Sequence, residues 1–553
     1  MSQGVVRLRV DREQPASPAY TGPRTGAQLA GLGHLRTVAG EQAEATALGI
    51  APKVRLPPWV TGELPLPARE PRGWLATRLP WQLFVILLVQ AGLSLRLVWS
   101  NTAFQDEALY IWAGRLEWSH WLRGTPVPDF PSYFSGAPVV YPPLAALAAV
   151  DGLAGARILS LCFMLAATCC LYGTGGRLYG RMAGIGGAAL FAVFGMTQVL
   201  GAFATYDAMA LFLLAAASWL TVRASGRVGE FLLILAAVLI VLADAAKYAA
   251  VLWDPVVFAL AGLVARGGVR RGIFRGLRLT GYVAILLACA LHVAGSQYVH
   301  GIMFTTVARK LPSNSTPEAV LLMSWGWLGA LVVIAALGTF LSLSDGRRRF
   351  TLAAVLLAAA ALAPLEQARI ATTTSLHKHV VFGAWFACII GGYAIQRMSR
   401  IDVKPAWAAA MTALAAVVLV IPGQSQADFL YATWPSFSKT MPAMAAAISA
   451  DGCPCLMYAT SVSQYYLQLS ATQVTSPATA ALDGLTGLAA ASDGIARGYY
   501  GVVEIDANDL LAPQDYDIVR AALQHSLYYR RVSVVPWPGH AATPSEVWER
   551  VIP

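Results

Sequence analysis

The sequence predicts an all-α polytopic membrane bundle of about eleven transmembrane helices, followed by a small α/β domain at the C-terminus. Of the 553 residues, 57% are hydrophobic and only 13% are charged, whereas soluble domains contain roughly 25% charged residues. Several apolar runs reach about 18 residues or more, enough to span roughly 30 Å of hydrocarbon. The C-terminal domain follows from a third observation: short strand-like and helix-like segments alternate after residue 422.

Three segments follow from this distribution. Residues 1–78 are polar and rich in Pro, Gly, Ala and Arg, which predicts a disordered cytoplasmic tail. Residues 79–422 form the predicted transmembrane domain, with a long loop at 101–153, and residues 423–553 form the α/β domain. The predicted spans are residues 81–100, 154–172, 183–203, 207–222, 229–244, 248–265, 279–298, 319–343, 350–364, 377–396 and 405–421.

The distribution of basic residues predicts the orientation. The net charge of +10 comes largely from arginines in alternate short loops, such as residues 266–278 and 347–349. Loops rich in Lys and Arg stay cytoplasmic, so this charge gives no indication of nucleic-acid binding. The N-terminus is then cytoplasmic, and both the loop at 101–153 and the C-terminal domain are extracytoplasmic. The abundance of Ala and Arg is typical of a high-GC bacterium, so we expect a multi-pass protein of the bacterial plasma membrane.

Asp106 and Glu107 are the first candidate catalytic residues. A carboxylate pair beside a membrane span is costly unless water, a cation or a reaction uses it. A carboxylate can deprotonate an acceptor hydroxyl and stabilise positive charge at an anomeric carbon. The alternative is the start of an interfacial helix, with Asp106 as the N-cap and Glu107 in the first turn.

Basic residues on the predicted outer side are candidates for binding a phosphate leaving group. They are Arg115, Lys247, Arg309, Lys310, Arg369 and Lys378. Of these, we expect at least one of Arg115, Lys247, Arg369 and Lys378 to contact the phosphate. The alternative for each is contact with lipid headgroups.

Further candidates for substrate binding lie near these residues: Tyr141, Asp207, Tyr248 and His377. Asp207 begins a predicted span, where it could orient a substrate or cap the helix. His377 and His379 are two residues apart and do not share a helix face, so we expect no metal site there. The segment Cys453-Pro454-Cys455 could form a disulfide, bind a metal or hold two free thiols beside a strand.

Several of these motifs occur in the order found in a known family. Asp106-Glu107-Ala108-Leu109-Tyr110 resembles the first-loop motif of the protein O-mannosyltransferase and aminoarabinose-transferase group. Tyr141-Pro142-Pro143-Leu144 and Gly155-Ala156-Arg157-Ile158-Leu159-Ser160 are similar to that group's entry to the second span, and Arg177-Leu178-Tyr179-Gly180 to its exit. The resemblance covers about residues 80–420.

The group belongs to the GT-C class of integral-membrane glycosyltransferases. The resemblance implies a polyprenyl-phosphate sugar donor, an active site that faces the exterior, and an inverting single displacement. Asp106 matches the motif's catalytic aspartate. Glu107 would position the acceptor or share the role of base. The implied partners are the lipid-linked donor, an extracytoplasmic glycan, lipid or protein as acceptor, and membrane lipids, and we expect no cofactor.

Two alternatives of other classes remain at this point. A transporter or lipid flippase would use Asp106, Asp207, Asp244 and Lys247 as an ion or proton pathway. Transporters often show broken helices in two related halves, a pattern that we do not find in the sequence. A catalytically inactive scaffold that presents the C-terminal domain is the other alternative.

Overall fold

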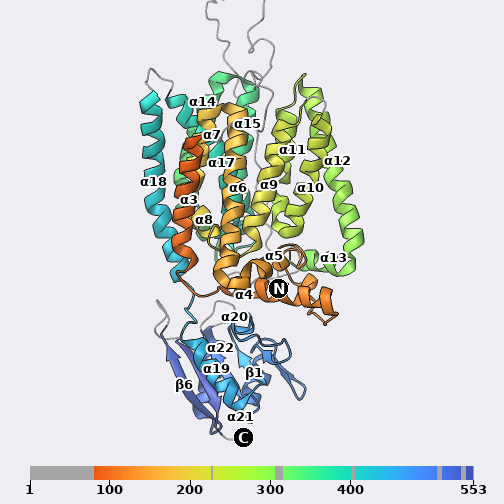
Figure 1. The fold of residues 1–553 in the computed structure, drawn as a ribbon, viewed down its shortest axis with the longest axis vertical. Helices are drawn as coiled ribbons and strands as arrows, with labels where there is room; N and C mark the ends of the chain where they lie inside the picture. The colour runs from red at the N-terminus through yellow and green to blue at the C-terminus, as the bar shows by residue number, and fades with distance from the viewer. Residues whose placement is uncertain are drawn as a thin grey trace, which may run out of the picture. The chain divides into compact units, whose positions relative to one another are not determined.

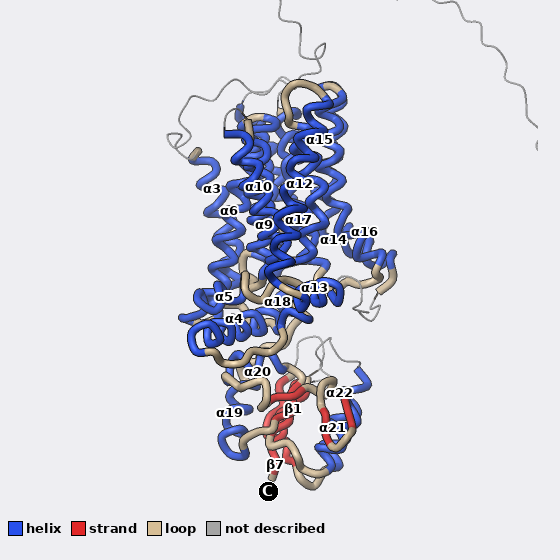
Figure 2. Tube along the Cα trace, turned by 90° about the vertical axis from the view of Figure 1, so that its right-hand side faces the viewer, coloured by secondary structure: helices blue, strands red, loops and turns tan. Residues whose placement is uncertain are grey.

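The structure is a computed structural model that describes residues 80–225, 228–305, 315–399, 405–506, 513–536 and 544–551 (Figure 1). The predicted cytoplasmic tail, residues 1–78, lies outside the described residues. Helices dominate the described chain, and strands occur within residues 455–550 (Figure 2). The chain is a multi-pass membrane protein with a small C-terminal sheet, as the sequence predicts.

All eleven predicted spans fall on helices of the structure. Eight helical segments among the described residues are long and apolar enough to cross a membrane. They contain α3 (Trp81–Val98), α6 (Leu153–Tyr179), α10 (Gly229–Ala246), α12 (Val269–Ala294), α14 (Pro317–Leu341), α15 (Arg347–Ala358) with α16 (Leu362–Arg369), α17 (Leu376–Met398) and α18 (Pro405–Ala432).

Of the other three predicted spans, one is broken, one is a single helix of 18 residues and one begins as a 3-10 helix. The span predicted at 183–203 consists of α7 (Arg181–Val193) and α8 (Gly195–Leu200), which are separated at Phe194, where the backbone is extended. The span predicted at 207–222 is α9 (Tyr206–Arg223). The span predicted at 248–265 begins as the 3-10 helix η4 (Tyr248–Trp253) and continues as α11 (Asp254–Leu263). The short α13 (Ser296–Met303) follows α12.

Helix α17 lies in the core of the bundle. Of its most apolar stretch, 94% is buried. Small residues allow its neighbours to approach closely. A Cβ atom added at Gly392 would lie 2.1 Å from the carbonyl oxygen of Ala183 in α7, so only glycine fits there. Close backbone approach through small residues is typical of helix packing in membranes. This packing fixes α17, whose first turn enters the candidate site described below.

The predicted loop at 101–153 contains helices that lie at one end of the bundle (Figure 1). They are α4 (Gln105–Arg123), η1 (Phe130–Ser132), α5 (Tyr141–Ala148) and η2 (Ala149–Asp151). The first turn of α4 is closed by Glu107, which accepts a hydrogen bond from the backbone N–H of Phe104 at 2.9 Å. The helix ends at Gly124, whose φ of 69° is a left-handed conformation that glycine adopts readily.

The transmembrane part extends past the predicted boundary between residues 422 and 423. Helix α18 continues to Ala432 with Pro422 inside it. Proline removes one backbone hydrogen bond, a loss that membrane helices tolerate where neighbours satisfy the freed group. The helix end contacts the first loop, since Asn101 donates from Nδ2 to the carbonyl oxygens of Tyr431 at 3.0 Å and Trp434 at 3.1 Å.

The C-terminal domain is built on a five-stranded sheet of order β2-β1-β5-β7-β6. Strand β1 pairs in parallel with β2 and β5, whereas β7 pairs antiparallel with β5 and β6. The strands are β1 (Cys455–Met457), β2 (Val474–Thr475), β5 (Val502–Ile505), β6 (Tyr529–Val535) and β7 (Ser545–Arg550), and β3 (Ala481–Leu482) pairs with β4 (Leu485–Thr486) in a separate hairpin. The helices are α19 (Thr440–Asp451), α20 (Thr460–Leu467), α21 (Gly487–Ala496) and α22 (Pro513–His525).

Of the three possibilities considered for Cys453 and Cys455, the structure contains the disulfide.

Candidate active site

Four charged side chains from different helices meet at the end of the bundle that carries α4. Asp106 lies in the first turn of α4 and Asp207 in the first turn of α9, where the helix dipole favours a negative charge. Lys378 lies in the first turn of α17, and Lys247 is the residue directly after α10. All four are candidates expected from the sequence, and the structure brings them together.

Asp106 and Lys378 form the outer ion pair of this cluster. The Lys378 ammonium donates to Oδ2 of Asp106 at 2.5 Å. The Asp106 side chain keeps 28% of its surface exposed, whereas that of Lys378 keeps 4%. The ammonium also lies 5.3 Å from the centre of the Phe203 ring. Asp106 is therefore held in place and still accessible.

Asp207 and Lys247 form the inner ion pair. The Lys247 ammonium donates to Oδ1 of Asp207, and the Thr205 hydroxyl donates to Oδ2 at 2.9 Å. Both side chains are buried, at 0% and 4% exposure. Lys378 interacts electrostatically with Asp207 as well as with Asp106. The two pairs thus form one network of two carboxylates and two ammonium groups.

Tyrosine side chains line the same cluster. The rings of Tyr110 and Tyr206 lie with centroids 4.5 Å apart, and the two hydroxyls interact. Burial, followed by the neighbouring Tyr206, raises the pKa of Tyr110 well above its ordinary value, so the phenol stays protonated. Tyr141 is fully buried beneath Tyr110, with its hydroxyl 3.5 Å from that of Ser160. The Tyr110 hydroxyl is thus engaged with Tyr206, and the Tyr141 ring packs against Tyr110 edge to face.

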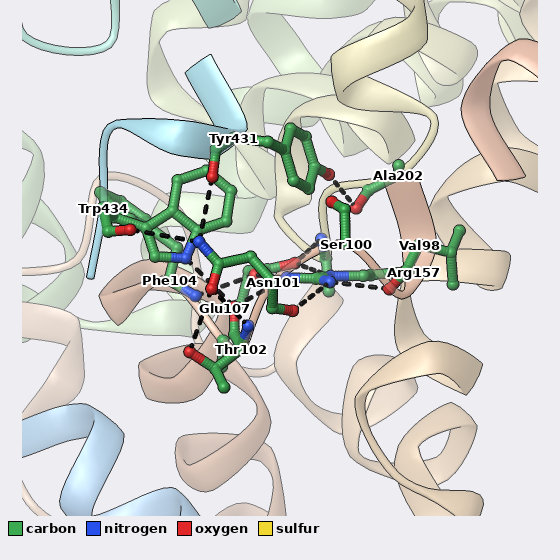
Figure 3. Close-up of polar contacts among 12 residues, drawn as sticks. Val98, Ser100, Asn101, Thr102, Phe104, Glu107, Arg157, Ala202, Tyr431 and Trp434 are labelled. Carbon is green, nitrogen blue, oxygen red and sulfur yellow. Dashed lines mark hydrogen bonds and ion pairs between the residues drawn. The ribbon is translucent and has the colours of Figure 1, made fainter. Parts of the chain in front are cut away.

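Glu107 lies in a separate buried network with Arg157 (Figure 3). Its carboxylate accepts from Arg157 Nε at 2.8 Å and from Arg157 Nη2 at 2.7 Å. It also accepts from the backbone N–H groups of Phe104 at 2.9 Å and Ala204 at 2.8 Å. With no exposed surface and both oxygens occupied, Glu107 has no free lone pair for an acceptor hydroxyl. The expected catalytic role of Glu107 does not fit this geometry, which makes it a positioning residue.

Arg157 extends that network to the segment before α4. Its guanidinium donates to the carbonyl oxygens of Val98 at 2.7 Å, Asn101 at 2.9 Å and Thr102 at 3.1 Å. These bonds hold the chain between α3 and α4, and hence the position of Asp106. Arg157 lies in a motif of the sequence, but no role was expected for it. Its position inside an apolar run could have indicated a role, because charged residues within membrane spans usually belong to a functional site.

Three of the remaining candidate residues form no hydrogen bond or ion pair with the four charged side chains of the cluster within the described chain. Arg369 is 65% exposed and pairs with Glu366 at 2.6 Å, so the structure does not bring it into the cluster. The Arg115 guanidinium lies 5.0 Å above the Tyr465 ring of α20, at the contact with the C-terminal domain. The Tyr248 hydroxyl is buried without a hydrogen-bond partner among the described residues.

The two histidines lie at the edge of the cluster. His377 is half-buried, meets the ring of Trp327 edge to face at 6.2 Å, and interacts electrostatically with Lys378, Asp207 and Asp106. The Nδ1 atom of His379 lies 2.8 Å from Nε2 of Gln367. Within the described ranges, no three His, Cys, Asp or Glu side chains group as metal ligands.

The chain was compared with known proteins. No protein-family model matches it, and no curated protein matches it. Solved structures do match. ArnT from Cupriavidus metallidurans in the apo state is 11% identical with a TM-score of 0.54, over 84% of this chain and 97% of that one. ArnT from the same organism bound to undecaprenyl phosphate is 12% identical with a TM-score of 0.57, over the same shares.

An oligosaccharyltransferase from Archaeoglobus fulgidus in the apo form is 12% identical with a TM-score of 0.53. The match covers 82% of this chain and 73% of that one. At such low identities, the likeness establishes the fold. The chain therefore has the GT-C fold of integral-membrane glycosyltransferases that the resemblance in its sequence led us to expect.

Proposed function

We propose that this protein transfers a sugar from a polyprenyl-phosphate donor to a hydroxyl group on an extracytoplasmic glycan, lipid or protein. The observation that carries the proposal is the pairing of a partly exposed carboxylate, Asp106, with a buried ammonium, Lys378. The fold supports it, since a solved structure with that fold holds undecaprenyl phosphate. In this proposal the protein lies in the bacterial plasma membrane with the cluster on its outer side.

The proposed reaction is a single displacement. Asp106 accepts the proton of the acceptor hydroxyl as the acceptor oxygen bonds to the anomeric carbon. The bond between that carbon and the phosphate oxygen breaks, and its electron pair leaves with the phosphate. The products are an inverted glycoside and polyprenyl phosphate. A positioned general base typically contributes about 10²–10⁴-fold to the rate.

The two lysines would bind the phosphate. A phosphate that enters beside Lys378 competes with Asp106 for the ammonium, and Lys247 lies in the same electrostatic network. Withdrawal of Lys378 from Asp106 leaves the carboxylate without its cation and makes it a better base. Donor binding would then activate the base in the same step that neutralises the leaving group.

Asp207 has a different role in this scheme. It is fully buried and is already bonded to Lys247 and Thr205. We assign it to holding Lys247 in position, with no direct contact to the reacting atoms. Tyr110, which lies next to Asp106, is assigned to donating a hydrogen bond to the substrate.

The experiment is a transfer assay in membranes that contain radiolabelled sugar on polyprenyl phosphate. Label is followed into glycan, lipid and protein fractions, so that the acceptor need not be known. Asp106→Asn keeps the shape of the side chain but removes its basicity. The matched control is Asp151→Asn, which changes an exposed carboxylate of the same loop. We expect loss of transfer in Asp106→Asn alone; equal transfer by both variants would contradict the proposal.

A further inference from the structure

A cavity lies far from the Asp106 cluster, at the other end of helix α9. Its volume is about 380 Å³, and it is lined by the ends of α6, α9 and α11 and by the starts of α10 and α12. Helix α9 begins beside the cluster at Tyr206 and ends beside this cavity. Its 18 residues correspond to a rise of about 27 Å. The cavity is thus separate from the candidate active site.

Five arginines and one glutamate line this cavity, which we call the arginine cavity. They are Arg177, Arg266, Arg271, Arg275, Arg278 and Glu230. Arg278 pairs with Glu230 at 2.9 Å, and Arg275 donates to the carbonyl oxygen of Thr221 at 2.6 Å. Within the described residues, the side chains of Arg177, Arg266 and Arg271 form no hydrogen bond or ion pair. The positive charge in the cavity therefore exceeds the negative charge.

The turn between α11 and α12 contains Arg266 and leads into Arg271, and both arginines line the cavity. Gly267 and Gly268 adopt φ values of 91° and 92°, which glycine tolerates without strain. A Cβ atom at Gly267 would lie 2.4 Å from a guanidinium nitrogen of Arg271, so the absence of a side chain lets the guanidinium lie over the backbone. The two glycines thus shape a turn that supports the cluster of arginines. Membrane topology alone would require only that the loop be positively charged.

The helices that carry the cavity also present apolar side chains to the surroundings. On α12, Ile273, Phe274 and Leu277 are 57%, 54% and 60% exposed, and Phe231 on α10 is 66% exposed. Phe274 itself lines the cavity. Exposed apolar surface on membrane helices faces lipid chains. A ligand in the cavity would therefore have arginines at its charged end and hydrocarbon beside it.

We propose that the arginine cavity binds the phosphate headgroup of an anionic membrane lipid. Guanidinium groups bind phosphate oxygens in bidentate fashion and lose little hydration in doing so. Basic pockets between membrane helices bind such headgroups in general. The cavity's excess of arginine over glutamate favours an anionic headgroup over a zwitterionic one. The same chemistry would accept a soluble phosphate, so the test must separate the two sources.

The test uses the full-length protein in detergent and native mass spectrometry. Phosphatidylglycerol and phosphatidylcholine with identical acyl chains are titrated separately, and inorganic phosphate is then added as a competitor. The variants are Arg271→Gln and the double variant Arg266→Gln with Arg271→Gln, both at exposed positions. The matched control is Arg347→Gln, which removes an exposed arginine outside the cavity. Thermal unfolding of each variant shows whether it is folded.

We expect the unmodified protein to retain phosphatidylglycerol in preference to phosphatidylcholine. The double variant should lose at least about tenfold in affinity for phosphatidylglycerol, and Arg347→Gln should bind like the parent. Equal binding of both lipids would overturn the proposal, as would an equal loss in Arg347→Gln and in the double variant. Binding of inorganic phosphate with the affinity of the lipid would also overturn it and would identify a soluble phosphate as the ligand.

Discussion

Replacement of Arg157 with methionine should destabilise the protein by about 3–5 kcal/mol, because it leaves the Glu107 charge buried without a cation. The pair is fully buried, with 0% exposure on both sides. The guanidinium also satisfies the carbonyl oxygens of Val98, Asn101 and Thr102. Each buried acceptor left unpaired costs about 1–3 kcal/mol, although such costs are not additive. Methionine keeps much of the volume, so a cavity contributes little to the loss.

The assay is reversible unfolding in detergent, followed by tryptophan fluorescence, with Arg369→Met as the matched control. The Arg369 and Glu366 side chains are 65% and 41% exposed, and surface pairs contribute only about 0–1 kcal/mol. The double variant Glu107→Gln with Arg157→Met should recover part of the loss, since it removes the unpaired charge. A change below about 1 kcal/mol in Arg157→Met, or equal losses at both arginines, would refute this reasoning.

Three further predictions concern the site and the topology. Lys378→Ala should weaken binding of the polyprenyl-phosphate donor by about 1.5–3 kcal/mol, whereas Arg369→Ala should not; isothermal titration in detergent measures both, and equal affinities would remove Lys378 from phosphate binding. Tyr110→Phe should lower turnover by about fivefold, the effect of one hydrogen bond of about 1 kcal/mol. Because burial raises the pKa of Tyr110, that factor should be the same from pH 6 to 9, and a pH-dependent ratio would show that the phenol titrates. A cysteine at Arg123 should react with a membrane-impermeant maleimide in intact cells, and one at Arg347 only after permeabilisation; the reverse pattern would invert the proposed orientation.

Hydropathy was sufficient to predict the membrane spans, because burying a helix in hydrocarbon requires a long apolar run whatever its neighbours are. Breaks within helices and short strands were harder to predict from the sequence. The break at Phe194 carries no proline or charge. Gly195, the next residue, packs against Gly423 of α18, because an added Cβ would lie 2.7 Å from the Gly423 carbonyl oxygen. Strand β7 likewise has no clear signal in its own residues. Its residues Ser545–Arg550 mix polar and apolar side chains and are stabilised by pairing with β5 and β6, which a single segment does not reveal.

The candidate site was predictable in its members but not in their pairing. Asp106, Asp207, Lys247 and Lys378 stand out as charges at the ends of apolar runs. Which carboxylate meets which lysine depends on how α4, α9, α10 and α17 pack, and the sequence does not encode this locally. The role of Glu107 could not be predicted for the same reason, because it depends on which charged residue packs against it. Its neighbour in sequence is the candidate base, but Arg157 turns it into a structural anchor.

The most direct test of the central claim is a cryo-EM structure of the protein with polyprenyl phosphate. We expect the phosphate to lie within hydrogen-bond distance of Lys378 or Lys247, with the Asp106 carboxylate released from Lys378 and facing an open acceptor position. The polyprenyl chain should leave the site between helices toward the lipid. A phosphate bound away from both lysines, with the pair between Asp106 and Lys378 intact, would contradict the proposed mechanism.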